Sequence, residues 1–277
     1  MIFLLLTILS SSLVSIIMRT SSDKVGSSRL SMLAANYVIC ALLGAIYADF
    51  NIFPTTESGI GTTAVLGTIN GFLYLASFIL LQVNTEKNGV VLSSLFMKLG
   101  LLVPMLLSVI FFAEIPTHVQ IVGFIIAVGA IILINLQSKT KGFGIGLILL
   151  TLLGGGAEAM AKVYEHMGTA ALSDTFLFYT FGIALLLCLA LIIIKKERPS
   201  LRALGFGALI GIPNFFSTKF LLGALSDLPA VVVYPSSNVG TILVVTLSGI
   251  LIFKERLNKA QWIGLGAIVM ALVLLNI

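Results

Sequence analysis

Long apolar runs separated by short polar stretches recur along the whole chain. Each run approaches the roughly 20 residues that an α-helix needs to cross the hydrocarbon core of a bilayer. A transmembrane β-barrel would instead alternate apolar and polar residues. The pattern predicts ten transmembrane helices at Ile2–Met18, Leu30–Tyr47, Gly61–Gln82, Asn88–Phe112, Thr117–Leu136, Phe143–Val163, Thr175–Ile194, Ala203–Leu225, Pro229–Phe253 and Lys259–Ile277.

The composition narrows the class of protein further. Of the 277 residues, 58% are hydrophobic and 10% are charged, against about 25% charged residues in an ordinary soluble domain. A soluble chain of this length cannot hide so much apolar surface, so a soluble enzyme, a nucleic-acid-binding module and a disordered chain are excluded. We therefore expect an all-α membrane protein in contact with the lipid bilayer, without a cleavable signal peptide. Cys40 and Cys188 lie in apolar runs and are expected to pack as free thiols.

The lysines and arginines between the predicted helices fall on one side of the membrane. Thirteen of the 16 basic residues lie in the loops that follow the odd-numbered helices: Arg19, Lys24, Arg29, Lys87, Lys139, Lys141, Lys195, Lys196, Arg198, Arg202, Lys254, Arg256 and Lys259. The loops on the other side carry none. Since basic loops stay in the cytoplasm, we predict a multi-pass protein of the cell membrane with both termini extracytoplasmic.

The two halves of the chain resemble one another. Residues 114–123 match residues 255–264 at an offset of 141, and residues 66–70 match residues 210–214 at an offset of 144. Each half has five predicted helices, which is an odd number, so the halves insert in opposite directions. The chain is therefore predicted to be two inverted five-helix repeats, an arrangement typical of secondary transporters.

These halves, residues 1–138 and 139–277, resemble units of the EamA family in the drug/metabolite transporter superfamily. The resemblance rests on the ten-helix inverted architecture and on an acidic residue, a glutamine and a glycine at the start of each half's last helix: Glu114, Gln120 and Gly123, then Glu255, Gln261 and Gly264. It implies a central cavity lined by the first four helices of each half, with the fifth peripheral. It names no cargo, because the superfamily moves amino acids, nucleotide sugars, sugar phosphates, cations and drugs.

The element at the start of each last helix is better explained by structure than by function. Thr117 and Gln120 have the spacing of a capping box, and Asn258 with Gln261 offers a similar cap. The glycine that follows permits close helix packing.

Charged residues inside the predicted spans carry more information. Such a residue costs at least roughly 2.5–3.5 kcal/mol on insertion scales, so its default interpretation is functional. Lys98 lies ~15 Å into its helix, while Glu158 and Lys219 both lie ~23 Å from the cytoplasmic ends of theirs. These depths permit a Glu158–Lys219 ion pair, and Lys162 is an i,i+4 neighbour of Glu158. Glu158 either neutralises a lysine or exchanges a proton or cation for cargo; Lys98 contacts an anionic group of cargo, pairs with an unseen acid or extends toward the cytoplasmic face.

Uncharged polar residues add further candidates. Asn70 and Asn214 are repeat-related and near the midplane, where they either form a site on the pseudo-two-fold axis or bond between helices. Residues 234–238 place a proline among hydroxyl and amide groups, which is typical of a kinked, cavity-lining segment. Tyr74 is a weaker candidate that packing explains equally well. The predicted cargo-binding residues are Asn70, Tyr74, Lys98, Glu158, Asn214, Lys219, Tyr234, Ser237 and Asn238.

These features favour a secondary active transporter that carries a small polar or charged metabolite or drug by alternating access, with protons or an exchanged cargo as coupling partner. The alternatives are a non-transporting membrane subunit or scaffold, and an intramembrane enzyme. The sequence offers no acid/base or metal cluster for an enzyme: His118 and His166 lie in outer loops without metal-ligand spacing. It also has no phosphate-binding loop. We therefore expect no cofactor, no nucleic-acid partner, and a monomer or homodimer.

Overall fold

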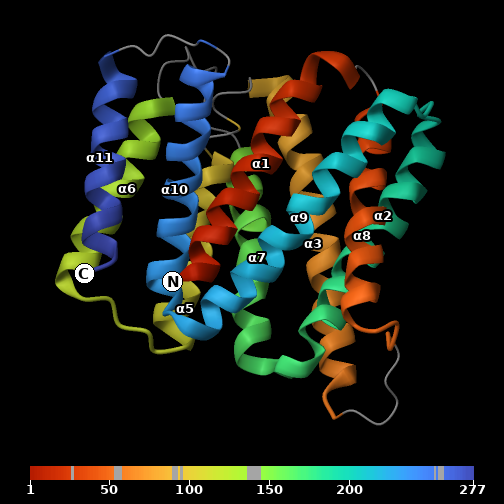
Figure 1. Ribbon diagram of the computed structural model, residues 1–277, viewed down its shortest axis with the longest axis horizontal. Coiled ribbons are helices and arrows are strands. Elements are labelled where there is room, and N and C mark those ends of the chain that lie inside the picture. Colours follow the sequence, from red (N-terminus) through yellow and green to blue (C-terminus); the bar gives the residue numbers. More distant parts are fainter. Residues whose placement is uncertain are drawn as a thin grey trace.

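The computed structural model describes residues 1–25, 28–52, 58–88, 93, 96–135, 145–252, 254 and 259–277, and these ranges contain helices and no strand. Figure 1 shows the helices as a bundle, with the two termini at similar heights along it. The elements are α1 (Ile2–Val25), α2 (Arg29–Tyr47), α3 (Ile60–Asn88), the 3₁₀ turn η1 (Leu99–Leu101), α5 (Leu102–Phe111), α6 (His118–Asn135), α7 (Ile145–Met167), the 3₁₀ turn η2 (Ala170–Leu172), α8 (Ser173–Lys195), α9 (Leu201–Asp227), α10 (Ala230–Leu251) and α11 (Lys259–Leu275).

The helices lie where the apolar runs predicted them, with three extensions at the C-terminal end. Helix α1 continues to Val25 instead of Met18, α3 to Asn88 instead of Gln82, and α7 to Met167 instead of Val163. The helices continue beyond the apolar runs through residues with polar side chains. In α3, for example, the Asn84 side-chain amide donates to the Leu80 carbonyl at 2.8 Å. The apolar pattern marks the stretch that can face lipid, not the end of the helix. Part of the fourth predicted helix lies outside the described residues.

Seven helices within the described ranges are long and apolar enough to cross a membrane: Ile2–Ser21, Arg29–Tyr47, Ile60–Thr85, Ile145–Met167, Ala170–Lys195, Leu201–Asp227 and Ala230–Leu251. Shorter apolar helices occupy Phe96–Phe111, His118–Leu133 and Trp262–Leu275. Their length falls below the roughly 20 residues of a full span. The all-helical fold with several apolar spans is therefore confirmed, while the count of ten spans stays a prediction.

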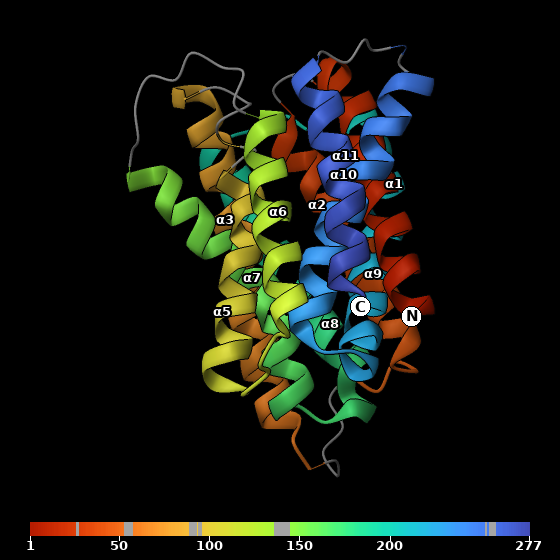
Figure 2. The same ribbon diagram turned by 90° about the vertical axis from the view of Figure 1, so that its left-hand side faces the viewer.

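The helices pack in a regular pattern across the bundle. Helix α1 packs against α9 and α10, and α7 packs against α3 and α5. Helix α2 packs against α8 and α9, and α8 also packs against α3. Helices α6 and α11 pack on each other at one edge of the bundle, opposite the α2–α8 pair (Figures 1 and 2). The last helix of each half thus lies at the periphery, and the other helices meet in the middle.

Glycines allow the central helices to approach closely. A Cβ atom on Gly67 of α3 would lie 2.6 Å from the Tyr179 Cβ of α8. A Cβ on Gly211 of α9 would lie 2.6 Å from the Ile39 Cβ of α2. Both distances are shorter than real Cβ contacts permit, so any larger residue would push these helices apart.

The predicted capping box at the start of α6 is present. The Gln120 backbone N–H donates to Thr117 Oγ1 at 3.2 Å, and the Thr117 N–H donates to Gln120 Oε1 at 3.0 Å. Gly123, one turn later, packs against α11, where a Cβ would lie 2.9 Å from the Leu274 Cβ. The structural interpretation of this element is therefore confirmed in the first half. In the second copy, Glu255 and Asn258 lie outside the described residues, so the corresponding cap stays a prediction.

Candidate functional site

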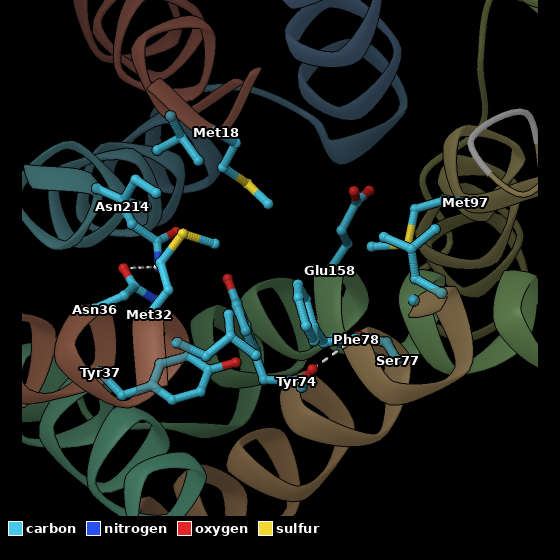
Figure 3. A pocket seen from close by; sticks show the side chains of 16 residues that line it. Met18, Met32, Asn36, Tyr37, Tyr74, Ser77, Phe78, Met97, Glu158 and Asn214 are labelled. Atoms are coloured by element: carbon cyan, nitrogen blue, oxygen red, sulfur yellow. Dashed lines mark hydrogen bonds between the residues drawn. The ribbon is translucent and has the colours of Figure 1, made fainter. Parts of the chain in front are cut away.

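Two adjoining cavities occupy the centre of the bundle. The first, which we call the apolar chamber, has a volume of about 270 Å³ and is lined by residues that include Met18, Met32, Leu33, Asn36, Tyr37, Ser77, Phe78, Leu81 and Ile210 (Figure 3). The second, the polar chamber, has a volume of about 280 Å³, and its lining includes Thr7, Ser11, Ser15, Lys98, Ser217, Thr218, Tyr234, Ser237, Asn238 and Thr241. Both linings share Val14, Tyr74, Met97, Glu158 and Asn214. The chambers therefore form one site with a polar and an apolar part.

Glu158 of α7 stands at the junction of the two chambers. Figure 3 shows its carboxylate directed into the space between Met18 and Met97. Helix α10 holds it in place: the Asn238 amide donates to Glu158 Oε2 at 3.3 Å, and the Tyr234 hydroxyl donates to the Glu158 carbonyl at 2.9 Å. The proline-containing segment 234–238 thus contributes Tyr234, Ser237 and Asn238 to the lining. The sequence predicted that this segment lines a cavity, and in the structure it lines the polar chamber.

Small residues set the position of Glu158 relative to Lys98. A Cβ on Gly155 of α7 would lie 2.7 Å from the Val103 Cβ and would collide with the Gly100 carbonyl oxygen. Pro104 of α5 lacks an N–H, so the Gly100 carbonyl has no helical donor four residues later. The chain forms the 3₁₀ turn η1 at this point. The glycine run 154–156 therefore acts in packing and brings α7 against the turn that follows Lys98.

Lys98 reaches the polar chamber and faces the same space as Glu158. Both side chains line the polar chamber, but the described residues contain no ion pair between the two within 4.0 Å. The structure places Lys98 in the lining of a cavity that an acid on another helix also lines. The three roles open to Lys98 from the sequence stay predictions.

Asn214 lines both chambers, and its amide donates to Asn36 Oδ1 at 3.2 Å (Figure 3). Tyr74 also lines both, and its hydroxyl lies 3.4 Å from Thr218 Oγ1. Asn70 differs from Asn214, because it is 1% exposed and its amide donates to Thr180 Oγ1 at 3.4 Å, between α3 and α8. The expectation that both asparagines face one cavity therefore holds for Asn214 and not for Asn70 in this conformation.

The two lysines considered as partners of Glu158 lie elsewhere. Lys219 Nζ pairs with Asp174 Oδ1 at 2.5 Å and lies 4.0 Å from the centre of the Tyr47 ring, outside both chambers. Similar predicted depth did not bring Lys219 to Glu158, because Lys219 faces Asp174 of α8 whereas Glu158 faces the chambers. The predicted Glu158–Lys219 pair is therefore wrong.

Lys162 is engaged by two other carboxylates. Its Nζ lies 2.8 Å from Glu114 Oε1 and 2.7 Å from Glu165 Oε2. Glu114 also accepts the backbone N–H groups of Ala230 and Val231, at 2.7 and 3.3 Å, and so caps the start of α10. The sequence drew attention to Glu114 as part of the repeated element but gave no sign of this tertiary cap.

Several lining residues were missed from the sequence. Asn36 is a buried amide inside an apolar run, a signal that was available. The methionines Met18, Met32 and Met97 come from three separate segments, and nothing in their spacing indicates that they meet. The searched, described residues contain no group of three or more histidine, cysteine, aspartate or glutamate side chains that could hold a metal ion.

The apolar chamber continues toward one end of the bundle. It shares Met18, Met32, Phe78 and Leu81 with a further cavity of about 250 Å³ that is also lined by Arg29 and Thr85. Toward the opposite end, the buried ring of Phe176 stacks on Tyr164 at 4.1 Å and that of Phe215 stacks on Tyr47 at 5.7 Å. A separate cavity of about 380 Å³, whose lining includes Asp174 and Lys219, lies at that end and shares no lining residue with the two chambers. The site therefore connects toward the end of the bundle where α2 begins.

A bundle of apolar helices around a charged, two-part cavity is what a multi-pass membrane protein with an internal cavity would show. Residues 142–277 match the model of a family described as the EamA-like transporter family. These residues make up the second half of the chain, and the resemblance to this family that was stated from the sequence is confirmed there.

Two relatives extend the comparison. An uncharacterized protein of Haemophilus influenzae is 27% identical over 203 residues, which cover 70% of this chain and 69% of that protein. A Proteus mirabilis protein named "Probable 4-amino-4-deoxy-L-arabinose-phosphoundecaprenol flippase subunit ArnE" is 38% identical over 61 residues, which cover 22% of this chain and 53% of that protein. A crystal structure superposes with a TM-score of 0.74 at 13% identity, over 99% of this chain and 94% of that chain. At this identity the superposition demonstrates a shared fold alone.

Proposed function

We propose that the protein is a secondary active transporter that moves a small polar or charged molecule across the cell membrane by alternating access. The observation that carries the proposal is the central site, where Glu158, Lys98 and Asn214 face one cavity between helices of both halves. Charged groups are expensive inside a membrane protein and mark cargo or ion pathways by default. In this proposal all ten helices cross the membrane, both termini are extracytoplasmic, and the unit is a monomer or homodimer.

The pattern of helix neighbours supports an inverted repeat. If each helix is exchanged for its counterpart in the other half, the α1–α9 contact becomes α7–α3, the α2–α9 contact becomes α8–α3, and the α1–α10 contact becomes α7–α5. All of these contacts are present. The α2–α8 and α6–α11 contacts map onto themselves, as expected for helices that meet on a pseudo-two-fold axis.

Two polar contacts obey the same exchange. Asn214 bonds to Asn36, and Asn70 bonds to Thr180; the offset of 144 converts one pair into the other. The site is nevertheless asymmetric, because Asn214 lines the chambers whereas Asn70 is buried. Within the described residues, the Asn70 Oδ1 atom is buried and without a hydrogen-bond partner.

This asymmetry is what alternating access between two inverted halves would produce. In the proposed mechanism the conformation described above is open toward the end bearing Arg29, which the charge distribution assigns to the cytoplasm. In the opposite conformation the halves exchange roles, so Asn70 and Thr180 line the cavity while Asn36 and Asn214 close together. The unsatisfied oxygen of Asn70 would then meet water or cargo, which offsets part of the cost of the movement.

Glu158 is the proposed coupling group, which binds a proton and cargo in alternation. Cargo binding should therefore release a proton from the wild-type protein. The test is calorimetry of binding in buffers of different ionisation enthalpy, using full-length Glu158→Gln and the control Glu165→Gln, at cargo concentrations that saturate each protein. Proton release by wild type and control, but not by Glu158→Gln, is the expected result. Equal release by all three would remove Glu158 from coupling.

Transport itself requires a separate experiment. Cargo candidates come from a thermal-stability screen against metabolite pools, because a bound ligand raises stability by mass action. Purified protein in liposomes loaded with a candidate should then accumulate labelled candidate by counterflow, and Glu158→Gln should exchange it more slowly than Glu165→Gln. Binding without any counterflow would contradict the transporter proposal.

One comparison favours a second candidate function. The Proteus mirabilis relative is named as a flippase subunit, so this chain is alternatively a non-transporting subunit or scaffold in a larger membrane complex. That function predicts co-purification with a partner chain in stoichiometric amount and no counterflow by the isolated protein. Neither candidate function assigns a catalytic step to this chain.

A further inference from the structure

A polar cavity lies apart from the central chambers, at the end of the bundle where α8 ends and α2 begins. Its volume is about 440 Å³, and it is lined by Leu30, Gln82, Lys195, Lys196, Glu197 and Arg198. None of these residues lines either chamber. Three of them are basic and belong to one short segment after α8, which we call the basic turn (residues 195–198).

The basic turn is fixed to the start of α2. Glu197 Oε1 accepts hydrogen bonds from the backbone N–H and the hydroxyl of Ser31, both at 2.7 Å, and Glu197 Oε2 accepts the Leu30 N–H at 3.2 Å. The Ser28 hydroxyl donates to the Arg198 carbonyl at 3.0 Å. The Glu197 carboxylate therefore caps α2, and the turn is held in place before any ligand arrives.

Lys196 has a backbone conformation that glycine usually adopts. Its φ of 51° and ψ of 37° are left-handed. The Lys196 N–H donates to the Ile193 carbonyl at 3.2 Å, and the Glu197 N–H donates to the Ile192 carbonyl at 3.1 Å. This is a Schellman motif, in which glycine avoids the strain that a Cβ atom causes. Strain of this kind gathers at functional sites, and lysine brings to the cavity a charge that glycine lacks.

The cationic groups of the basic turn have no acidic side chain paired with them. Lys195, Lys196 and Arg198 are all exposed, and none of them forms an ion pair within 4.0 Å among the described residues. The carboxylate of Glu197 faces the N–H groups of α2 instead. The lining thus carries three positive charges against one negative charge, which favours an anionic ligand.

Exposed apolar side chains adjoin the basic turn on both sides along the chain. Ile193 and Ile194 are 75% and 73% exposed, and Leu201 is 89% exposed. In a membrane-spanning bundle such side chains face hydrocarbon, whereas lysine and arginine at helix ends reach the headgroups. The distribution of basic loops assigns this end to the cytoplasm, where anionic lipids attract basic segments. The cavity therefore lies at the level expected for lipid phosphate groups.

We propose that this cavity binds the phosphate group of an anionic phospholipid from the surrounding bilayer. The three basic side chains contact the charged headgroup, the Gln82 amide donates a further hydrogen bond, and the acyl chains lie along the exposed isoleucines of α8. Since Gln82 belongs to α3 and Leu30 to α2, a bound headgroup links the ends of three helices. The inference goes beyond the transporter function and holds equally for a non-transporting subunit.

The chemistry of the lining favours a phospholipid over a free phosphate. A guanidinium group binds two phosphate oxygens at once, and ammonium groups add point charges. A free phosphate forms these same contacts but leaves the exposed isoleucines uncovered. A lipid is also confined to the membrane, which raises its effective concentration at the cavity. The lipid should therefore bind more tightly than its phosphate group alone.

The first experiment counts lipids bound to the purified full chain by native mass spectrometry, at increasing lipid concentration in detergent. The probes are dioleoyl phosphatidylglycerol, which is anionic; dioleoyl phosphatidylcholine, which has the same tails without net charge; and glycerol 3-phosphate, which has no tails. Phosphatidylglycerol should bind saturably and at least about tenfold more tightly than the other two. Equal binding of phosphatidylcholine would overturn the proposal, and equal or tighter binding of glycerol 3-phosphate would assign the cavity to a soluble phosphate instead.

A double variant tests whether the lipid occupies this cavity. Lys195→Gln with Arg198→Gln should weaken phosphatidylglycerol binding about fivefold for each charge removed. The control is Lys254→Gln with Arg202→Gln, which removes the same two charges at the same end of the bundle but outside the lining. The control should change the affinity less than about twofold, since distant charges are screened. Equal losses in both double variants would show binding spread over the basic surface and would overturn the site.

A substitution to glycine separates lipid binding from folding. Lys196→Gly relieves the left-handed backbone, so its midpoint of thermal unfolding without added lipid should be unchanged or raised. Phosphatidylglycerol should raise the midpoint of wild type by mass action, and it should raise that of Lys196→Gly less. The control is Lys254→Gly, since Lys254 is also left-handed, with a φ of 54°, but lies outside the lining. This control should keep the full lipid effect, and an equal lipid effect in Lys196→Gly would overturn the contact with Lys196. No cargo enters either experiment, so the outcome is independent of the transporter proposal.

Discussion

The Glu114 carboxylate, in the segment between α5 and α6, joins α7 and α10 at the end of the bundle where α10 begins. It accepts hydrogen bonds from the first two backbone N–H groups of α10 and forms an ion pair with Lys162 of α7. The Glu114 side chain is 16% exposed and the Lys162 side chain 9%. The substitution Glu114→Gln keeps the shape and one acceptor oxygen but removes the negative charge, so it tests the electrostatic part of this connection.

The expected loss of stability follows from these contacts. A hydrogen bond to a charged group contributes about 1.5–3 kcal/mol, and removing one partner of a buried ion pair costs about 3–5 kcal/mol. Lys162 keeps Glu165 as a second partner at 2.7 Å, and the glutamine oxygen still accepts one N–H. We therefore expect Glu114→Gln to lower the free energy of unfolding by about 2–3 kcal/mol, at the lower end of these ranges.

The assay uses the two buried cysteines. Cys40 and Cys188 are free and 0% exposed, so a thiol-reactive fluorophore labels them only as the protein unfolds. The control is Glu165→Gln, which removes the other partner of Lys162 but caps no helix; its more exposed i,i+3 pair should cost less than about 1 kcal/mol. Equal unfolding temperatures for the two variants would refute a stabilising effect of Glu114 on the start of α10. An unchanged unfolding temperature in both variants would refute any stabilising effect of the Glu114–Lys162–Glu165 contacts.

Three further predictions concern packing, the outer charges and topology. Gly155→Ala should destabilise the protein by about 1–3 kcal/mol, because the new methyl group meets the Gly100 carbonyl. The control is Gly182→Ala, since nothing lies within 4 Å of the Cβ position of Gly182. This control should leave the midpoint of thermal unfolding unchanged or slightly raised. Lys219→Met should lower stability by less than about 1 kcal/mol. It should leave unaltered the affinity, measured by calorimetry, for a cargo found in the thermal-stability screen; altered affinity would place Lys219 in the site. A reporter active only in the cytoplasm should be silent when fused after Ile277, and a bright signal would refute the predicted topology.

Most of the fold could be predicted because lipid imposes a simple rule. A chain segment in hydrocarbon must satisfy its backbone hydrogen bonds internally, so a long apolar run predicts a helix with little ambiguity. The rule gives no information once the helix leaves the apolar zone, which is why α1 and α3 extend beyond the predicted ends. The capping box at Thr117 was equally predictable, because it depends on residues three positions apart.

The candidate site was only partly predictable, because its contacts join distant parts of the chain. Depth along a helix placed Glu158 level with Lys219, but the direction of each side chain around its helix decides which partner it meets. The contact of Gly155 with Gly100 fixes that direction for α7, and it brings Glu158 toward Lys98. A repeat offset predicts equivalent positions in the two halves, but not that one member is buried while the other lines a cavity, as with Asn70 and Asn214.

The proposed repeat also accounts for a charged site that is not duplicated and in which a ligand would have one orientation. The offset of 144 makes Val14 the counterpart of Glu158, and the offset of 141 makes Val239 the counterpart of Lys98. Val14 lines both chambers beside Glu158, whereas Val239 is fully buried. If the charges were duplicated, a ligand would meet two equivalent sites in opposite orientations and two buried charge pairs to desolvate. In the proposed two-fold scaffold with one carboxylate and one ammonium, the related halves would still exchange conformations, while a bound molecule would have one orientation and one set of charged partners.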